Sequence, residues 1–304
     1  MDDRPGYDDL DAHLKKLAAA GLLHTIDREI DKDREMHPLV RWQYRGRIPE
    51  KNRKAFVFTN VSDAKGRAYP GAKVTIGALA ATPDIYALGL GKPREDIGKT
   101  WIEAMAAPIA PKVVDAAPCQ EVVLTGDDLL GEGKGLDALP IPISTPGYDT
   151  APYFTAGLWA TRDPDTSIQN LGLYRGNLKA PNRVAVMMER STLAGGGVHW
   201  RKYKARGEKM PAAVVLGAPP LVAFTGPQKL PLDCDELGVA GALAGCPIEV
   251  VRCKTVDLLV PATAQVIVEG FIDTDSLEPE GPFGESHGYM ALEEYNFSMT
   301  VTAI

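Results

Sequence analysis

Two glutamates five residues apart, Glu280 and Glu285, lie in a short segment that also contains Gly281, Pro282 and Gly284. The glycines allow the chain to bend sharply and the proline stiffens it, so both carboxylates can face one site. Neighbouring carboxylates resist joint ionisation, and active sites use this effect to keep a proton donor near neutral pH. The spacing indicates acid–base chemistry, although acidic residues are also common in exposed loops.

A second polar segment, residues 170–175, combines an amide with a cation. Asn170 offers a neutral oxygen ligand, and Arg175 offers a guanidinium that can hold a carboxylate through two parallel hydrogen bonds. The segment follows an expected strand and a turn at residues 163–165. An arginine in this position could orient a carboxylic acid.

Two further residues could contribute to a metal site. His199 follows three glycines at residues 195–197, and this pattern predicts a flexible loop that carries an imidazole. Glu236 lies near the start of an expected helix. With Asn170 they form an O/N/O set that suits Mn2+ or Mg2+ better than a structural zinc ion. Each also has a simpler interpretation: His199 could be an ordinary surface histidine or one satisfied by a hydrogen bond, and Glu236 could be a carboxylate that complements the helix dipole.

Two motifs resemble known sites but lack the required context. Residues 93–100 resemble a P-loop, yet Pro93 replaces the first glycine and cannot donate an N–H to phosphate. Residues 284–288 formally match the G-x-S-x-G nucleophile motif around Ser286. A turn-rich loop precedes that motif, and the one histidine downstream is the neighbouring His287. Triphosphate binding is therefore not expected, and serine hydrolysis is a distant alternative.

The composition is that of an ordinary soluble protein. The 304 residues are 45% hydrophobic and 24% charged with a net charge of −7, and the length favours two domains. The most basic run, residues 201–206, is typical of a solvated helix face or loop rather than a nucleic-acid site. The four cysteines form no CxxC, which indicates reduced thiols. With neither an apolar leader nor a membrane-spanning run, we expect a cytoplasmic protein without nucleic-acid or membrane partners.

Periodicity and turn residues predict the order of the elements. Helices are expected over residues 8–20, from residue 82, over residues 93–105 and over residues 235–244. Strands are expected over residues 55–58, 73–76, 121–124, 153–161, 183–189, 212–216, 249–252, 265–270 and 297–303. We predict an α+β fold with an α/β domain at residues 1–117 and a strand-rich barrel or antiparallel sheet at residues 118–304. The last strand runs to Ile304 without a following turn, so we expect further sequence beyond it.

Four ordered motifs resemble the UbiD family of reversible decarboxylases. The motifs are residues 170–175, 210–217, 257–262 and 280–289, and agreement extends over most of residues 120–304. The resemblance implies an N-terminal α/β domain followed by a split β-barrel domain built like a flavin reductase. It also implies that the C-terminal α/β domain usual in this family is absent from these 304 residues.

The resemblance implies prenylated FMN as the cofactor. Carried over by position, Asn170, His199 and Glu236 would bind a divalent metal, Mn2+ or Mg2+, which holds the flavin phosphate, with K+ nearby. The residues that would contact the flavin or its metal are Thr155, Asn170, Leu173, Tyr174, Arg175, Val198, His199 and Glu236. A flavin prenyltransferase would supply the cofactor.

The resemblance also implies the catalytic residues. Arg175, Glu280 and Glu285 match a Glu-Arg-Glu network, in which Arg175 would orient the substrate carboxylate and Glu285 would deliver the proton that replaces CO2. The flavin would accept the electrons left when the C–C bond breaks. The expected reaction is the reversible, non-oxidative decarboxylation of an aromatic or α,β-unsaturated carboxylic acid.

Two other functions stay open. The chain could be a non-catalytic flavin-binding subunit whose partner supplies the missing domain, because that domain usually helps to cover the active site and to form the oligomer. Where the C-terminal domain is present, a homo-oligomer is expected. Serine hydrolysis through Ser286 is the more distant possibility.

Overall fold

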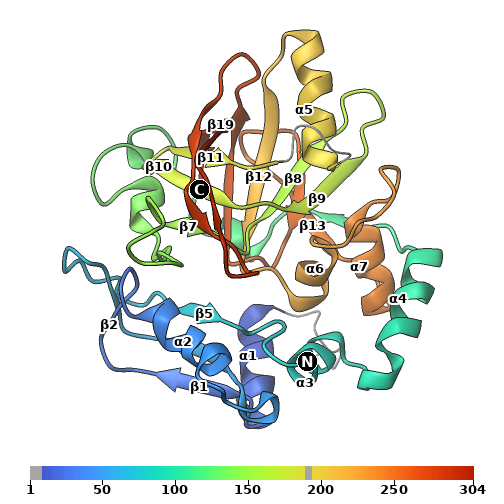
Figure 1. Ribbon diagram of the computed structural model, residues 1–304. Helices are drawn as coiled ribbons and strands as arrows, with labels where there is room; N and C mark the ends of the chain where they lie inside the picture. The colour runs from blue at the N-terminus through green and yellow to red at the C-terminus, as the bar shows by residue number, and fades with distance from the viewer. Residues whose placement is uncertain (1–8, 189–193) are drawn as a thin grey trace.

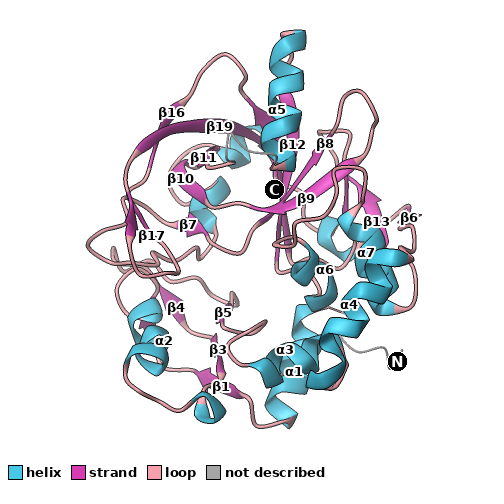
Figure 2. Cartoon of the chain, turned by 45° about the vertical axis from the view of Figure 1, so that its right-hand side comes forward, coloured by secondary structure: helices cyan, strands magenta, loops and turns pink. Residues whose placement is uncertain are grey.

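The computed structural model describes residues 9–188 and 194–304. Figure 1 shows the N-terminal third of the chain, in blue, below a curled sheet of green, yellow and red strands. Figure 2, turned by 45°, shows a group of helices along one side, next to the sheet and to the N-terminal helices. The site described below lies where these parts meet.

The N-terminal part combines α-helices with small β-sheets. Its helices are α1 (Leu10–Ala19), α2 (Met36–Arg45), α3 (Pro83–Leu90) and α4 (Ile97–Ala106). Its strands are β1 (Leu23–Ile26), β2 (Ile30–Asp31), β3 (Ala55–Phe58), β4 (Val61–Ser62) and β5 (Val74–Ile76). β3 lies between β1, which is parallel to it, and β5, which is antiparallel, while β2 pairs with β4.

Local signals account for two of these helices. The side chain of Asp9 accepts a hydrogen bond from the backbone of the first turn of α1 (2.7 Å), and Leu14 and Leu17 bury one face. Gly21 follows α1 with φ +71°, a conformation that favours glycine. Thr82 caps α3 in the same way as Asp9 caps α1. The predicted helices at residues 8–20 and from residue 82 are confirmed within the described residues.

The main sheet pairs its strands antiparallel. Its strands are β7 (Tyr153–Phe154), β8 (Leu158–Arg162), β9 (Gln169–Leu173), β10 (Gly176–Ala180), β11 (Arg183–Val186), β12 (Met210–Leu216), β15 (Val266–Ile272), β16 (Glu278–Glu280) and β19 (Glu294–Ala303). They follow the order β7-β10-β11-β19-β15-β12-β8-β9, and β16 pairs with β19.

The connection between β9 and β10 shows how far this sheet curls. The two strands lie towards opposite ends of the strand order, yet they are joined through Tyr174 and Arg175 alone. The sheet must therefore bend round until its ends approach each other, as the half-barrel in Figure 1 shows. Tyr174 and Arg175 cross the opening, and this curled sheet confirms the α+β fold with a split barrel.

The remaining elements cover the sheet or its edges. They are α5 (Gly195–Arg206), α6 (Pro220–Thr225), α7 (Glu236–Ala244), β6 (Lys112–Val114), β13 (Glu249–Arg252), β14 (Leu259–Pro261), β17 (Phe283–Gly284) and β18 (Met290–Ala291). β6 pairs parallel with β13, so this strand of the proline-rich stretch joins a sheet with the later part of the chain. The domain boundary at residue 117 stays a prediction.

Alternation along the strands builds two cores. On β12, Ala212 and Val214 face the inside of the curl with the fully buried Trp159, whereas Ala213 and Val215 face the other side, where Leu237 of α7 packs. This alternation follows from the two-residue period of a strand. Both faces of β12 are therefore buried, which explains its nearly continuous apolar sequence.

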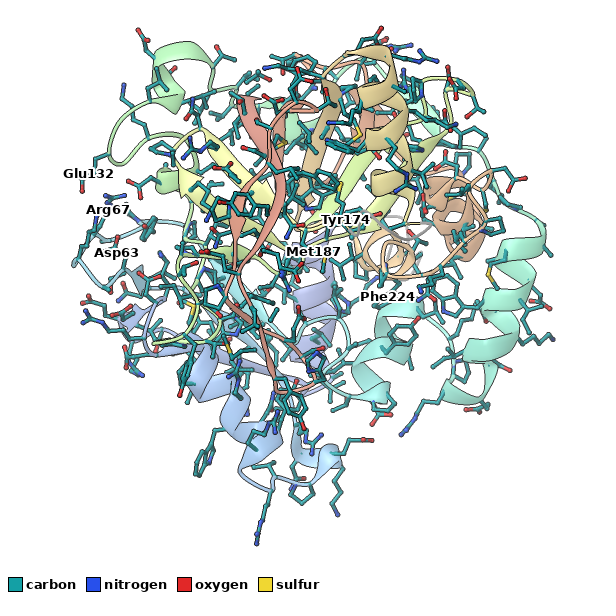
Figure 3. The ribbon with its side chains drawn as sticks, turned by 45° about the horizontal axis from the view of Figure 1, so that its top comes forward. Asp63, Arg67, Glu132, Tyr174, Met187 and Phe224 are labelled. Atoms are coloured by element: carbon teal, nitrogen blue, oxygen red, sulfur yellow. The ribbon has the colours of Figure 1, made fainter. Side chains whose placement is uncertain are left out.

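An aromatic contact and a group of ion pairs are among the contacts that join the N-terminal part to the barrel. The rings of Tyr86 on α3 and Phe224 on α6 lie 4.3 Å apart between centroids. On another side, Arg67 forms ion pairs with Asp137 (2.7 Å) and Glu132 (3.3 Å), and Figure 3 shows Arg67 beside Glu132. The aromatic contact excludes water, whereas Glu132 is largely exposed and adds little to the free energy of unfolding.

Three of the predicted strands need correction. Residues 121–124 form no strand; among the described residues, Leu124 makes its backbone hydrogen bonds with the chain end at Ile304 alone. Residues 153–161 form two strands rather than one, because the chain breaks at residues 155–157 before it crosses the sheet. β11 ends at Val186, and the predicted end of that strand at residue 189 lies outside the described residues.

The predicted flexible loop at residues 195–197 is wrong, because these glycines form the first turn of α5. Glycine disfavours a helix in isolation, but here it lets α5 pack closely against β9. The basic run at residues 201–206 also lies on α5, where Lys202 pairs with Asp163 and Arg206 pairs with Asp165. No helix in the described ranges is both long and apolar enough to span a bilayer.

Candidate active site

Arg175 holds the two glutamates identified from their spacing. Its Nε and Nη2 donate to the two carboxylate oxygens of Glu280 at 2.9 and 2.8 Å, and its Nη1 donates to Oε1 of Glu285. Glu280 is fully buried, whereas Glu285 is 28% exposed. The guanidinium therefore bridges an inner carboxylate to an outer one that can reach a substrate. Asn296 on β19 supports the inner carboxylate through a further bond to Oε2 (3.2 Å).

The backbone fixes this arrangement from both sides. On one side, the indole of Trp159 donates to the carbonyl of Tyr174 (2.9 Å), and the amide of Met187 donates to the carbonyl of Arg175 (3.2 Å). On the other side, Gly281 bends the chain with φ +101°. A Cβ at Gly284 would lie 2.1 Å from Oγ1 of Thr145, so no larger residue fits there without a shift. These constraints explain the glycines of the acidic segment.

Charge pairing determines the protonation of Arg175. Burial lowers the pKa of this guanidinium, but the hydrogen bonds and charges of Glu280 and Glu285 more than offset that effect, so its pKa is raised overall. Arg175 is thus a permanent cation whose positive charge is already compensated by two carboxylates.

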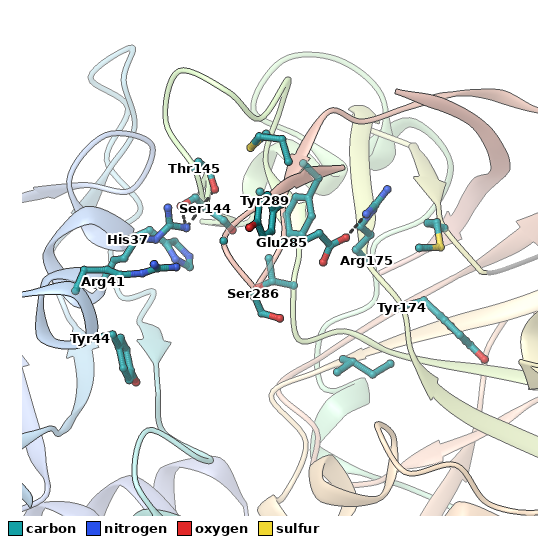
Figure 4. Close-up of a pocket in the computed structure, with 18 residues that line it drawn as sticks. His37, Arg41, Tyr44, Ser144, Thr145, Tyr174, Arg175, Glu285, Ser286 and Tyr289 are labelled. Carbon is teal, nitrogen blue, oxygen red and sulfur yellow. Dashed lines mark hydrogen bonds and ion pairs between the residues drawn. The ribbon is translucent and has the colours of Figure 1, made fainter. Parts of the chain in front are cut away.

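A cavity of about 880 Å3 opens in front of Arg175 (Figure 4). The barrel contributes Thr155, Leu173, Tyr174, Arg175 and Met187, the acidic segment contributes Phe283, Gly284, Glu285, Ser286, Gly288, Tyr289 and Met290, and other segments contribute His37, Arg41, Tyr44, Arg45, Ser144 and Thr145. We call this the front cavity. Glu285 is the carboxylate among these lining residues, and it faces the space that a substrate would occupy.

A second cavity, of about 590 Å3, shares Leu173 and Tyr174 with the front cavity. It is also lined by Asn170, His199 and Glu236, and we call it the rear cavity. Because the same two side chains line both, the rear cavity and the front cavity are direct neighbours.

His199 is a neutral imidazole in this structure. It lies on α5 and is 3% exposed, and its Nδ1 lies 2.9 Å from Oγ1 of Thr161 on β8. Burial lowers the pKa of His199 to about 4, so the ring carries no charge at neutral pH. An imidazole held at Nδ1 can present Nε2 to a metal ion.

The pKa of Glu236 is shifted in the opposite direction to that of His199. Glu236 is the first residue of α7, it is nearly buried, and its Oε2 accepts a hydrogen bond from the amide of Leu171 (2.8 Å). Burial raises the pKa of this carboxyl to about 7. A cation in the rear cavity would favour the ionised form of Glu236, which could then serve as one of its ligands.

Asn170 and the glycines of α5 complete this wall. Nδ2 of Asn170 is buried and has no hydrogen-bond partner among residues 9–188 and 194–304. A Cβ at Gly195 would lie 1.9 Å from Oδ1 of Asn170, so glycine is needed where α5 approaches β9. The amide of Gly196 donates to the hydroxyl of Tyr174 (3.1 Å). The glycines therefore bring the N-terminus of α5, with its partial positive charge, up to the rear cavity.

The donor set fits a metal only if an amide oxygen takes part. Within the described residues, no three His, Cys, Asp and Glu side chains come together to hold a metal ion. An ion in the rear cavity would therefore use Asn170 with His199 and Glu236, and would take further oxygens from a phosphate or water. The N-terminus of α5 and Lys229 line the same cavity, and both favour a phosphate there.

The structure brings most of the predicted site residues together. Thr155 is exposed to the front cavity, and Glu280 lies directly behind Arg175. Val198 lies on α5 beside His199, outside the described lining of either cavity. Ser286 lines the front cavity, but a short strand, not a helix, follows its motif, and the neighbouring His287 is exposed. The motif around Ser286 thus lacks the helix that must follow a nucleophile motif of this kind.

Sequence reasoning missed several residues of the site. Thr161 and Asn296 support His199 and Glu280 from strands that are remote in sequence, and no local pattern could reveal that. His37, Arg41 and Arg45 recur every four residues on α2, and this spacing was a usable signal for one helix face. We return to that face below.

We expect the metal-free protein to lose stability as the pH falls from 6.5 towards 4. The pKa of His199 is about 4 in the folded chain and near 6.5 in the unfolded chain, so unfolding takes up a proton in this range. The contribution of the neutral His199 to the free energy of unfolding is complete above pH 6.5. It falls by on the order of 3 kcal/mol at lower pH. Urea unfolding of EDTA-treated protein should show a smaller pH slope for His199→Gln than for the unchanged chain. An equal slope would contradict a neutral buried imidazole.

The two parts of the chain match two family models. Residues 14–105 match the 3-octaprenyl-4-hydroxybenzoate carboxy-lyase N-terminal domain, and residues 112–304 match the Rift-related domain of the same enzymes. These models define the class as UbiD carboxy-lyase domains. The chain belongs to the UbiD family.

Solved structures support the same assignment. The chain is 28% identical to an evolved dimeric form of HmfF from Pelotomaculum thermopropionicum in complex with prFMN, with a TM-score of 0.86 over 97% of this chain and 64% of that one. It is 25% identical to vanillic acid decarboxylase from Sedimentibacter hydroxybenzoicus, with a TM-score of 0.85 over 98% and 61%. It is 26% identical to a 3,4-dihydroxybenzoic acid decarboxylase from Enterobacter cloacae, with a TM-score of 0.83 over 98% and 62%. The chain thus spans less than two thirds of the length of these relatives.

Proposed function

We propose that this chain carries the flavin site and the acid–base residues of a decarboxylase that uses prenylated FMN. The substrate is an aromatic or α,β-unsaturated carboxylic acid, and the reaction is non-oxidative and reversible. The observation that carries the proposal is the single guanidinium of Arg175, which binds both Glu280 and Glu285 next to Leu173 and Tyr174, the wall that the two cavities share. The relatives named above include a complex with prFMN and two decarboxylases of aromatic acids.

The flavin would occupy both cavities. Its phosphate fits the rear cavity, next to Mn2+ or Mg2+ held by Asn170, His199 and Glu236, with K+ nearby. Its ring system fits between Leu173, Tyr174 and Arg175, with Thr155 in reach and Val198 behind. When bound, prenylated FMN supplies an electron sink for the electron pair that remains when CO2 leaves.

The protein supplies position and a proton. Arg175 orients the carboxylate of the acid, and Glu285 holds the proton that the substrate carbon receives in place of CO2. Glu280, with both oxygens bound to the guanidinium, keeps Arg175 in one rotamer. In the reverse direction, Glu285 accepts the proton that the incoming CO2 replaces.

The proposed cofactor and the family together suggest partners for the proposed enzyme. A flavin prenyltransferase would supply prenylated FMN, and we expect a cytoplasmic protein that forms a homo-oligomer where the C-terminal domain of the family is present.

Co-expression with a flavin prenyltransferase tests the proposal. We expect the purified protein to carry one flavin with the mass of prenylated FMN, and to release CO2 from a member of a panel of hydroxybenzoic, heteroaromatic and acrylic acids. Flavin without CO2 release would favour the non-catalytic subunit, whose partner completes the site. Labelling of Ser286 by a fluorophosphonate, without bound flavin, would favour a serine hydrolase instead.

A further inference from the structure

One wall of the front cavity comes from the N-terminal part and carries its own positive charge. His37, Arg41 and Arg45 lie four residues apart on α2, so they share one face of that helix, and all three line the cavity. Figure 4 shows His37 and Arg41 across the cavity from Arg175, with Glu285 and Ser286 between them. Burial, with a smaller effect of Arg41, lowers the pKa of His37 to about 4, so the charge of this face comes from the two arginines.

The two arginines have no acidic partner among the described residues. Nη2 of Arg41 donates to the carbonyl of Ser144 (3.3 Å) and to Oγ1 of Thr145 (3.2 Å), which fixes the guanidinium without neutralising it. Arg41 acts on the carboxyl of Asp149 through its charge, but the ion pairs of the described residues include none between the two; the oxygens of Asp149 accept the backbone amides of Gly284 (2.8 Å) and Thr145 (2.6 Å). The charge of Arg41 therefore remains available to a ligand.

Arg45 reaches the turn that carries Glu285. A Cβ at Gly288 would lie 2.8 Å from Nη2 of Arg45, and Gly288 has φ +98°. A larger residue at this position would displace the guanidinium. Arg45 therefore lies against the residues that follow the proposed proton donor, and it lines the same cavity.

The two facing walls of the front cavity differ in net charge. The positive charge of Arg175 is already offset by Glu280 and Glu285, so this wall of the cavity carries no net positive charge. The α2 wall carries two positive charges. An anion entering the cavity is thus drawn towards α2, and a group that remains there gains charge-assisted hydrogen bonds.

We propose that Arg41 and Arg45 form a second anion subsite, which selects acids that carry another carboxylate at the end remote from the reacting one. The inference rests on the proposed function, because that function places the reacting carboxylate at Arg175 and Glu285. A dicarboxylic acid can place one carboxylate at Arg175 and the other at Arg41 and Arg45. A monocarboxylic acid can bind only at Arg175, and Arg41 and Arg45 then remain hydrated. The preferred substrate is therefore a planar dicarboxylic acid.

Equilibrium binding tests this subsite without requiring turnover. The flavin-loaded protein is titrated with terephthalate and isophthalate, each compared with its monoamide, which keeps the shape and removes one charge. We expect at least one dianion to bind about tenfold more tightly than its monoamide, as charge-assisted bonds at a partly exposed site would give. The preference should disappear in the double variant Arg41→Gln/Arg45→Gln.

Arg47→Gln is the matched control, since Arg47 also is exposed and lies two residues beyond Arg45, outside the described lining of the cavity. Arg47→Gln should keep the preference for the dianion over its monoamide. If this variant loses the preference as fully as the double variant does, the effect is one of general charge, and the proposed subsite is overturned. Equal binding of each dianion and its monoamide, or a preference that survives the double variant, would overturn it as well. Dianion binding without CO2 release would contradict the proposed function alone. CO2 release from benzoic acids without a dianion preference would contradict the subsite alone.

Discussion

The variant Glu285→Gln is expected to lose decarboxylation by about 10²- to 10⁴-fold while it retains its flavin. The amide can still accept the hydrogen bond from Nη1 of Arg175, so the geometry of the cluster should survive. It cannot hold a transferable proton, and Glu285 is the carboxylate that faces the front cavity. CO2 release and flavin absorbance per chain, measured on the same sample, separate the two effects.

Glu293→Gln provides the matched control for this experiment. Glu293 is an exposed residue of the same segment, lies outside the described lining of the front cavity, and loses the same charge on substitution. It should keep the activity of the unchanged chain. Turnover of Glu285→Gln within a few-fold of the unchanged protein would rule out Glu285 as the proton donor.

The variant Glu236→Gln is expected to bind Mn2+ more weakly than the unchanged chain, but to be more stable in its metal-free form. Loss of a charged ligand should weaken Mn2+ binding by more than about 100-fold, since even residues behind the ligands commonly contribute 10- to 100-fold. Flavin that depends on the metal should be lost with it. Metal content by mass spectrometry and flavin per chain by absorbance measure both.

The metal-free form of this variant should be more stable at pH 8. The pKa of Glu236 is about 7 in the folded chain against an ordinary value of 4.5, so the carboxyl stabilises the fold least above pH 7. An amide removes that cost, which is on the order of 3 kcal/mol. Thermal unfolding of EDTA-treated protein at pH 8 should therefore show a higher Tm for Glu236→Gln.

Asp233→Asn is the control, because Asp233 is exposed, lies three residues before Glu236 and loses the same charge. It should change neither metal content nor Tm appreciably. A Glu236→Gln protein that retains Mn2+ would remove Glu236 from the metal site. One that loses both Mn2+ and stability would indicate a structural role instead.

Local patterns in the chain predicted a large part of the fold. The helix at residues 8–20 follows from its leucine spacing and Gly21, and the strands at residues 212–216 and 249–252 follow from short apolar runs between turns. These signals hold because burial on one face and turn chemistry act over a few residues. The strand predicted at residues 121–124 is wrong, because an apolar run alone does not provide a partner strand.

The glycines of α5 show where local reasoning fails. Three consecutive glycines disfavour a helix by roughly 1 kcal/mol each relative to alanine, so a loop was the reasonable expectation. The helix forms because Gly195 and Gly196 pack against Asn170, Tyr174 and Met188, where side chains would collide. Tertiary packing decided this element.

The sequence by itself determined the chemistry that is possible: an arginine, two glutamates five residues apart, and an Asn, His and Glu suited to a hard divalent ion. Only the tertiary structure decided which of them meet. The curl of the sheet brings Arg175 across the barrel opening to Glu280 and Glu285, more than 100 residues later in the chain. The packing of the N-terminal part against the barrel sets α2 opposite that cluster. Such contacts depend on how distant strands and helices pack, which no local pattern in the chain records.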